Sequence, residues 1–482
     1  MAAPEEPPSR DAPDAPPAAG TLDELPALDA LGPSGTFRAR NRITLTDVAG
    51  RPAATLGLVP RLYVRRTMAA LRAASPPPAA ERFALLARAG RIFAEDTIGG
   101  LDPAAHERIT ARVSGVPLGV VRAAAAAVTE AAEQAAYILD QARPAGAADS
   151  RSDPRTRRGS AVWTRRGSVF AVHAAGNHPG PHSLWLEALA LGYRVAVRPS
   201  RREPFTPYRL VAALRAAGFG PDQVALLPTG HEVADTVLDE ADLGLVYGGD
   251  EVVAKYGGSR VLPQGPGRSK ILVTAGRDWR DHLDVIVDSV AHQGGVACIN
   301  ATTVLVEGDP GPLARALAER LAASADLPPE DPKAVLPVQP AGHARALEAY
   351  LLTRAAEPGA RAWLGGDGIV SELGDGSAVL RPAVHQLERS DDPRTGLEMP
   401  FPCVWVAPWS RAQGIAPLRG SLVVSVLGPD ADTGPLVDEL LAEPTVSNVY
   451  TGSRPTYWIR PGVPHDGFLS EFLMRTKTVA RD

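Results

Sequence analysis

The chain has 482 residues, of which 45% are hydrophobic, so it can bury a large core, and its length predicts roughly two to four domains. Its formal net charge of −5 argues against a nucleic-acid-binding protein, which needs a concentrated basic face. The two cysteines cannot form a disulfide framework, the first residues lack a secretory apolar segment, and no apolar run is long enough for a membrane span. We therefore expect a cytoplasmic protein.

The first part of the chain divides into a leader, short strands and a helical stretch. Residues 1–34 are rich in proline, alanine and acidic residues, and this composition predicts a disordered leader. Short strands are expected within 36–50 and 52–59. From about 60 to 141 the apolar pattern is helical.

An arginine-rich segment follows, with six arginines at positions 151–166. Alternation around SAVWT predicts an exposed hairpin rather than a helix. One interpretation is a solvated or subunit-contact surface. The other is a docking face for an acidic partner, such as a carrier protein or a phosphorylated substrate.

From residue 168 onward, short apolar runs alternate with amphipathic segments. Strands are predicted at 168–176, 194–200, 223–230 and 243–249, with helices between them at 181–191, 207–218 and 231–240. This rhythm indicates βαβ units and a parallel sheet covered by helices on both faces. Ligands bind such sheets beyond the carboxyl ends of the strands, and Asn177 lies at one of those ends.

A second α/β lobe begins near residue 271 and contains Cys298, which follows two glycines and precedes an apolar strand. A lone cysteine is more often a small buried hydrophobe than a nucleophile, so its context leaves both roles open. Cys403 lies inside the apolar run PFPCVWVAP, which predicts a core position. No GxGxxG fingerprint, Walker loop, GxSxG, CxxC or HExxH is present, and we expect no metal site.

Six blocks in order carry a resemblance: AGNHPG, VRPSRREPFTP, VYGGDEVV, QGPGRSKILV, GGVACIN and GLEMPFP. Their order and spacing resemble the aldehyde dehydrogenase superfamily. The resemblance implies an α/β fold with two doubly wound parallel-sheet domains and a small oligomerisation hairpin. It implies a homodimer or homotetramer, because an exposed strand edge normally finds a partner. The implied parts are an NAD(P)-binding domain at 35–147 and 167–265, oligomerisation elements at 148–166 and 459–482, and a catalytic domain at 266–458.

The resemblance also implies roles for individual residues. Cys298 matches the nucleophile, and Asn177 matches the asparagine whose amide holds the oxyanion formed by thiolate attack. Glu398 matches the glutamate that holds the nicotinamide ribose. Gly248 and Gly249 are expected near the cofactor diphosphate, with Gly249 standing where serine is usual.

The adenosine end of the cofactor site departs from the family pattern. Where the family has KPSE, this chain has Arg198, Pro199, Ser200 and Arg201. Losing the acid removes a partner for the ribose 2′-hydroxyl, and the arginines suit a 2′-phosphate. The sequence therefore favours NADP(H) over NAD(H), unless these are ordinary surface arginines.

The largest departure is Gln264, a cofactor-side position where hydrolytic family members have the glutamate that activates water. Glutamine can orient a water molecule but cannot accept its proton. The chain therefore looks most similar to the glutamate-lacking acyl-CoA reductase branch, which includes the fatty acid reductase of bacterial bioluminescence. The resemblance predicts NADPH-dependent reduction of an acyl thioester, bound to CoA or acyl carrier protein, to an aldehyde through a Cys298 acyl-enzyme.

Other interpretations remain open. The enzymatic alternative is an aldehyde dehydrogenase that releases the free acid, with water activated by another residue such as His178; His292 is a second possible base. Two further alternatives are an acyl-phosphate reductase and a degenerate family member that serves as an assembly or carrier-docking protein.

Overall fold

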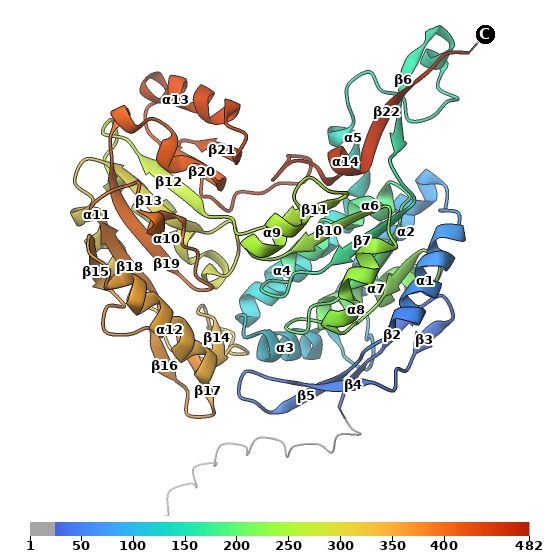
Figure 1. Ribbon diagram of the computed structural model, residues 1–482, viewed down its shortest axis with the longest axis horizontal. Helices are drawn as coiled ribbons and strands as arrows, with labels where there is room; N and C mark the ends of the chain where they lie inside the picture. The colour runs from blue at the N-terminus through green and yellow to red at the C-terminus, as the bar shows by residue number, and fades with distance from the viewer. Residues whose placement is uncertain (1–24, 482) are drawn as a thin grey trace, which may run out of the picture.

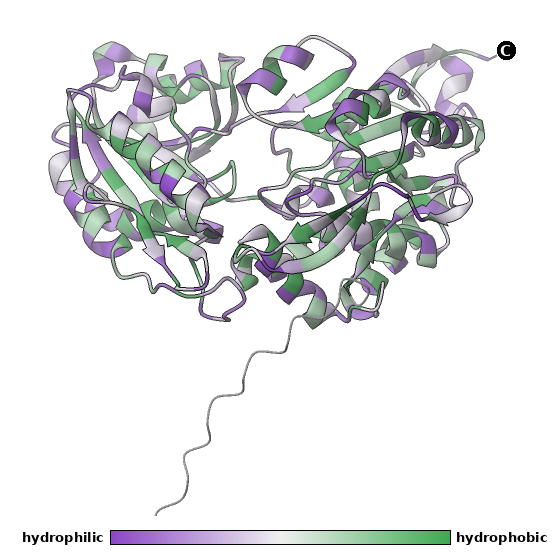
Figure 2. Ribbon diagram, turned by 60° about the horizontal axis from the view of Figure 1, so that its bottom comes forward, coloured by the Kyte–Doolittle hydropathy of each residue, from purple (hydrophilic) through white to green (hydrophobic). Residues whose placement is uncertain are grey.

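Two seven-stranded sheets form the body of the protein and lie side by side (Figure 1). The structure is a computed structural model that describes residues 25–481. Figure 2 shows the apolar residues concentrated on the strands and the hydrophilic residues on the outer turns of the helices. The predicted fold class, an α/β protein with two parallel-sheet units and a small additional strand pair, is confirmed.

The first sheet has a parallel centre and an antiparallel edge. Its strand order is β11 (Val261–Gln264), β10 (Leu243–Tyr247), β7 (Val169–His173), β8 (Arg194–Arg198), β9 (Val224–Leu226), β2 (Ala30–Gly32) and β3 (Gly35–Phe37). The chain order reverses at β7, which pairs with β8 on one side and β10 on the other. Such a reversal opens a crevice at the carboxyl ends of the strands.

Alternation along β7 explains why both faces of this sheet are covered. Phe170 and Val172 belong to one core cluster, whereas Val169 and Ala171 belong to another, because successive side chains point to opposite faces. The first face is covered by α2 (Ala79–Glu95), α4 (Leu118–Glu133), α5 (Ala135–Ala142), α6 (Leu186–Ala190) and α7 (Phe205–Ala217). The second is covered by α1 (Arg61–Ala73), α8 (His231–Asp239) and α9 (Asp250–Tyr256).

The second sheet repeats this plan with different partners. Its order is β15 (Ala360–Leu364), β18 (Ala383–Leu387), β19 (Cys403–Trp409), β13 (Ala301–Glu307), β12 (Ser269–Val273), β20 (Ser421–Leu427) and β21 (Val446–Thr451). One face packs on α10 (Leu283–Ala291) and α11 (Gly311–Leu321), and the other on α12 (Ala341–Ala355) and α13 (Asp430–Ala442). Cys403 lies in the second of these cores, as predicted.

Smaller sheets border the two large ones. One joins β1 (Ala27–Leu28), β5 (Pro52–Gly57) and β4 (Arg42–Thr46), and the other joins β14 (Val338–Pro340), β17 (Ser377–Leu380) and β16 (Val370–Glu372). The remaining long helix is α3 (Pro103–Ser114), which begins after the N-cap Asp102. None of the helices within residues 25–481 combines the length and apolar character that crossing a bilayer requires.

The predicted leader at 1–34 is corrected in its last part. Residues 1–24 lie outside the described residues, but Leu28 and Leu31 are buried in strands β1 and β2. Leu31 pairs with Leu226 of the first sheet, and Leu28 pairs with Leu56. Burial of these leucines and the backbone pairing hold the segment in place despite its polar neighbours.

The predicted hairpin at 151–166 is also corrected, because its two strands are distant in sequence. Residues Pro154–Arg158 form a 3₁₀ helix, which the Asp153 carboxylate caps by accepting from the N–H of Arg155 at 2.9 Å. Only β6 (Ser160–Arg165) is a strand, and it pairs antiparallel with β22 (Met474–Val479). The β6–β22 arm projects from the body above α5 and α14 (Leu469–Leu473) (Figure 1).

Candidate active site

Cys298 lies in a tightly turned loop between α10 and β13. Gln293, Gly294 and Gly295 all have positive φ, at 52°, 73° and 67°. A Cβ on Gly295 would overlap the backbone at Phe401 and Pro402, so only glycine allows this close approach. The glycines noted in the sequence therefore press the nucleophile loop against the start of β19.

Asn300 holds this loop from inside. Its side-chain oxygen accepts from the N–H of Ala297 at 2.9 Å, and its amide nitrogen donates to the carbonyl of His292 at 2.8 Å. The Ser269 hydroxyl donates to the carbonyl of Cys298 at 3.1 Å. The backbone around the thiol is thereby fixed. Sequence reasoning missed Asn300, although its position two residues after the cysteine was a usable signal.

Asn177 reaches the same loop from the first sheet. It follows β7, and its amide nitrogen donates to the carbonyl of Val296 at 3.0 Å. That is the one hydrogen bond its amide donates within residues 25–481, so its second N–H remains free for another acceptor. The structure thus places Asn177 against the loop that carries Cys298, 121 positions later in the sequence.

The resting thiol of Cys298 is neutral at physiological pH. Burial, together with the negative charges of Glu398 and Asp466, raises the pKa of this thiol to about 12. Glu398 is itself buried, which raises the pKa of its carboxyl group, and it accepts from the backbone N–H of Arg268 at 2.8 Å. Deprotonating this thiol therefore requires a base or a nearby positive charge.

Two further residues near the thiol were not predicted. Burial and the charges of Cys298 and Asp466 raise the pKa of Tyr247, which ends β10. Asp466 has φ of 58° and accepts from the hydroxyl of Ser447 at 2.9 Å. Nothing in the motif HDG around Asp466 pointed to this place, because the loop comes from far along the chain.

Arginines without counter-ions lie at the carboxyl end of β8. The Nε of Arg198 donates to the Thr229 hydroxyl at 2.8 Å, a neutral partner. The Nε of Arg201 is buried and has no acceptor in the described part of the chain, and neither arginine forms an ion pair there. A Cβ on Gly176 would overlap the Ser200 hydroxyl, so this loop lies directly against the one that carries Asn177.

The other cofactor-side residues lie at the ends of β10 and β11. The N–H of Gly248 donates to the carbonyl of Gln264 at 3.1 Å. Gly249 is the N-cap of α9, and a Cβ there would meet nothing within 4 Å, which leaves open space at this turn. Asp250 in the first turn of α9 forms an ion pair with Arg268 at 2.6 Å. This pairing offsets the negative charge of Asp250, which would otherwise repel an anion at this turn.

The two histidines suggested as bases lie in different environments. Nδ1 of His178 accepts from the N–H of Gly180 at 2.9 Å, so the neutral ring carries its proton on Nε2 and has no free lone pair. Burial lowers its pKa to about 4. The His292 ring stacks on Tyr457 with 3.7 Å between centroids, and burial lowers its pKa. This arrangement argues against His178 as a base.

The described residues suit an anionic cofactor better than a metal ion. Within the described residues, no group of three or more histidine, cysteine or acidic side chains could hold a metal ion. By contrast, the unpaired Arg198 and the orphaned Nε of Arg201 fit an anionic group, and the free surroundings of Gly249 fit a bulky one. The residues present therefore suit a phosphate-bearing cofactor.

Comparison with known sequences yields one family. The profile described as "Aldehyde dehydrogenase family" matches residues 35–413. The chain is similar to malonate-semialdehyde dehydrogenase 1 of Geobacillus kaustophilus, with 24% identity over 154 residues, 30% of this chain and 32% of that protein. It is also similar to malonate-semialdehyde dehydrogenase 2 of Bacillus mycoides, with 25% identity over 130 residues, 25% of this chain and 27% of that protein. These matches span about a third or less of the relatives' length.

Solved structures share the fold over nearly the whole chain. An NAD-dependent aldehyde dehydrogenase from Sinorhizobium meliloti superposes with a TM-score of 0.79 at 18% identity, covering 95% of both chains. Betaine aldehyde dehydrogenase from Staphylococcus aureus, in complex with NAD+, gives a TM-score of 0.79 at 17% identity, covering 95% of this chain and 96% of that one. At such identity the likeness establishes the fold alone.

Proposed function

The chain belongs to the aldehyde dehydrogenase family, and from that premise we propose that it oxidises an aldehyde with a nicotinamide cofactor through a covalent intermediate on Cys298. The observation that carries the proposal is the hydrogen bond from the Asn177 amide to Val296, which holds an N–H donor beside the nucleophile loop. The sequence similarity to malonate-semialdehyde dehydrogenases supports aldehyde oxidation over the acyl-thioester reduction expected from the sequence.

In this proposal the Cys298 thiol loses its proton to solvent, and the resulting thiolate attacks the aldehyde carbonyl carbon. A carbon–sulfur bond forms, the carbonyl π bond breaks, and the resulting oxyanion accepts hydrogen bonds from the Asn177 amide and the Cys298 backbone N–H. A bound nicotinamide would accept the hydride that leaves the tetrahedral carbon. A thioester would then remain on the sulfur. Fixing the loop through Asn300 and Ser269 keeps the sulfur in one position for both steps.

We propose that the cofactor is NADP(H). Arg201 stands where the family has an acid, and its buried Nε has no acceptor among the described residues. Arg198 donates only to a neutral hydroxyl. Two cations that form no ion pair among the described residues suit a 2′-phosphate at the adenosine end.

The fate of the thioester distinguishes two candidate activities. Gln264 cannot accept a proton from water, and the ring of His178 has no free lone pair. Hydrolysis therefore needs another base, and the candidate we propose to test is Asp466, an exposed carboxylate whose negative charge contributes to the raised pKa of Cys298. The second candidate is transfer to a thiol such as CoA or a carrier protein, or the reverse reaction, NADPH-dependent reduction of an acyl thioester; the observation that favours it is Gln264.

The experiment is a product assay with purified protein. A panel of aldehydes, including small semialdehydes, is incubated with NADP+ or NAD+, with and without CoA, and compared with C298A. Free acid made without CoA, and lost in D466N, supports aldehyde dehydrogenase activity with Asp466 as base. Acyl-CoA made only with CoA favours the thiol-dependent candidate. Absence of nucleotide binding and of all turnover would reject both and favour an assembly role.

We also propose self-association through the β6–β22 arm. The carbonyl of Ala148 accepts from the N–H of Trp163, and the N–H of Ala148 donates to the carbonyl of Ala161. Ala148 therefore covers part of the free edge of β6. The outer edge of β22 has no strand partner among the described residues, and such an edge is a template for pairing with another chain. Light scattering after size-exclusion chromatography should give a dimer or tetramer. The variant T476P, which removes an N–H that faces the outer edge of β22, should shift the protein toward monomer.

A further inference from the structure

A second cavity lies at the edge of the first sheet opposite the active site. It has a volume of about 810 Å³ and is bounded by the β6–β22 arm, α2, α5 and α6. Gly167 and Ser168, which line it, precede β7, whereas Asn177 follows that strand. The length of β7, roughly 16 Å, separates the two sites. The cavity is therefore not part of the catalytic crevice.

Two arginines from different elements meet in this cavity. Arg82 on α2 donates from Nε to the carbonyl of Ala190 at 2.8 Å and from Nη1 to that of Pro77 at 2.6 Å. Arg165 on β6 donates from Nη1 to the carbonyl of Gly192. A Cβ on Gly192 would lie 3.2 Å from Arg82 Cζ and 3.5 Å from Arg165 Nη1, so both guanidinium groups face the same glycine. Their remaining N–H groups have no partner within the described chain.

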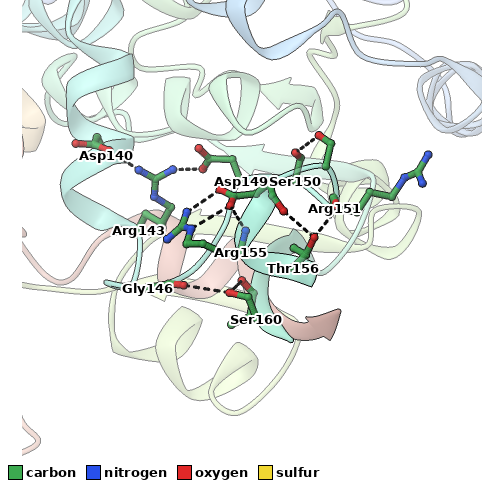
Figure 3. Close-up of polar contacts among 12 residues, drawn as sticks. Asp140, Arg143, Gly146, Asp149, Ser150, Arg151, Arg155, Thr156 and Ser160 are labelled. Carbon is green, nitrogen blue, oxygen red and sulfur yellow. Dashed lines mark hydrogen bonds and ion pairs between the residues drawn. The ribbon is translucent and has the colours of Figure 1, made fainter. Parts of the chain in front are cut away.

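The acids that line the cavity do not neutralise these arginines. Asp140 and Asp149 are both engaged by Arg143, whose Nη2 lies 2.6 Å from Asp140 and whose Nη1 contacts Asp149 (Figure 3). In the described residues, neither Arg82 nor Arg165 forms an ion pair. Burial and the charge of Arg165 lower the pKa of Arg82 to about 10, as expected for adjacent cations without a counter-ion.

Apolar side chains also line the cavity. They are Phe83, Leu139, Trp163, Leu191 and Met474. An indole and a phenyl ring beside two forked cations suit a ligand that combines a planar or apolar part with a phosphate group. Inorganic phosphate alone would use only the cationic half of such a site.

We propose that this cavity binds a small phosphate-bearing organic anion, whose phosphate bridges Arg82 and Arg165 and whose planar part lies against Trp163. Because Arg82 comes from the body and Arg165 from the arm, the bound phosphate would tie the arm to the body. It would remove the repulsion between the two guanidinium groups. The predicted role of the arginine-rich segment as a docking face for a phosphorylated molecule is thereby narrowed to one residue, Arg165.

The test uses AMP as the probe, with inorganic phosphate and uncharged adenosine for comparison, at constant ionic strength and without added nicotinamide cofactor. Hydrogen exchange is followed in peptides covering 160–168 and 188–193, because this local readout separates the cavity from the cofactor crevice whether or not the proposed function is correct. AMP should slow exchange in both peptides, phosphate should do so more weakly, and adenosine should have no effect.

Variants sharpen the result. R82Q and R165Q should each weaken AMP binding by about tenfold or more, since each removes charge-assisted hydrogen bonds. R475Q, on the exposed face of β22, removes the same charge from the arm and should bind AMP like wild type. If R82Q fails to fold, comparison of R165Q with R165K decides. The proposal is overturned if AMP leaves the exchange unchanged, or if R165Q and R475Q bind AMP equally well. It is also overturned if the arginine variants lose self-association without any effect on AMP binding.

Discussion

The two large sheets contribute to the active site from opposite edges. In the first sheet, Asn177 follows β7, Arg198 ends β8 and Gly248 follows β10. In the second, Cys298 precedes β13 and Glu398 precedes β19. The carboxyl edge of one sheet therefore meets the amino edge of the other, as the Asn177–Val296 hydrogen bond demonstrates. The candidate site therefore follows the rule that ligands lie beyond the carboxyl ends of strands in the first sheet only.

The largest effect should come from the residue at the amino edge of the second sheet. C298A should lower kcat by at least about 10³-fold, because no other thiol can form the covalent intermediate. Nucleotide binding, followed by fluorescence titration, should stay within about twofold of wild type, since binding relies on the other sheet. C403A, a change in the core, serves as the control. Retained turnover in C298A would exclude the covalent mechanism.

The next effect should come from the carboxyl edge of the first sheet. N177A should lower kcat by about 10²–10³-fold, because it removes a donor to the oxyanion while leaving the thiol in place. Alkylation of Cys298 by iodoacetamide should proceed at nearly the wild-type rate, which distinguishes oxyanion stabilisation from collapse of the loop. A large change in alkylation with kcat preserved would assign Asn177 a purely structural role.

A third prediction concerns the cofactor end of the first sheet. R201Q should raise KM for NADP+ by about tenfold, since one charge-assisted contact to the 2′-phosphate is lost. KM for NAD+ should change little. R202Q, the exposed neighbour, removes the same charge and is the matched control. Equal loss with both cofactors would place Arg201 outside the 2′-phosphate site.

The smallest effect is expected at the amino edge of the first sheet, where Glu187 of α6 accepts from the N–H of Ser470 at 3.1 Å. Burial raises the pKa of Glu187 to about 7, so the folded protein keeps a proton that the unfolded chain loses above its ordinary value. Unfolding free energy therefore falls as pH rises from about 4.5 to 7.

E187Q removes this penalty. At pH 8 it should raise the free energy of unfolding by an amount on the order of 1–3 kcal/mol, and at pH 4.5 by much less. Urea denaturation at both pH values measures the difference, while kcat should stay unchanged because the site lies at the other edge. Equal denaturation midpoints at pH 8 would show that the carboxyl group is already ionised at no cost.

The sequence predicted local features well and distant pairings poorly. The run SVFAV predicts β7 because it supplies apolar side chains to both faces of a sheet. The position of Asn177 is then predicted from the turn that follows this strand. Asp466 could not be found, because its place beside Cys298 depends on a loop far along the chain. The resemblance grouped 148–166 with the C-terminal segment 459–482, but the first of these was predicted to form its own hairpin. Strand alternation in SAVWT does not show that its direct partner is β22.

The pairing of β6 with β22 has a consequence for synthesis. Thr164 bonds to the carbonyl of Arg475, 311 positions later. At about 5–20 residues per second, a ribosome needs roughly 15–60 s between them. During that interval the strand SAVWTR emerges with its own edge unsatisfied while the first sheet can already form around it. A nascent chain stalled before residue 474 should therefore engage holdase chaperones at this strand, and release should end the interaction.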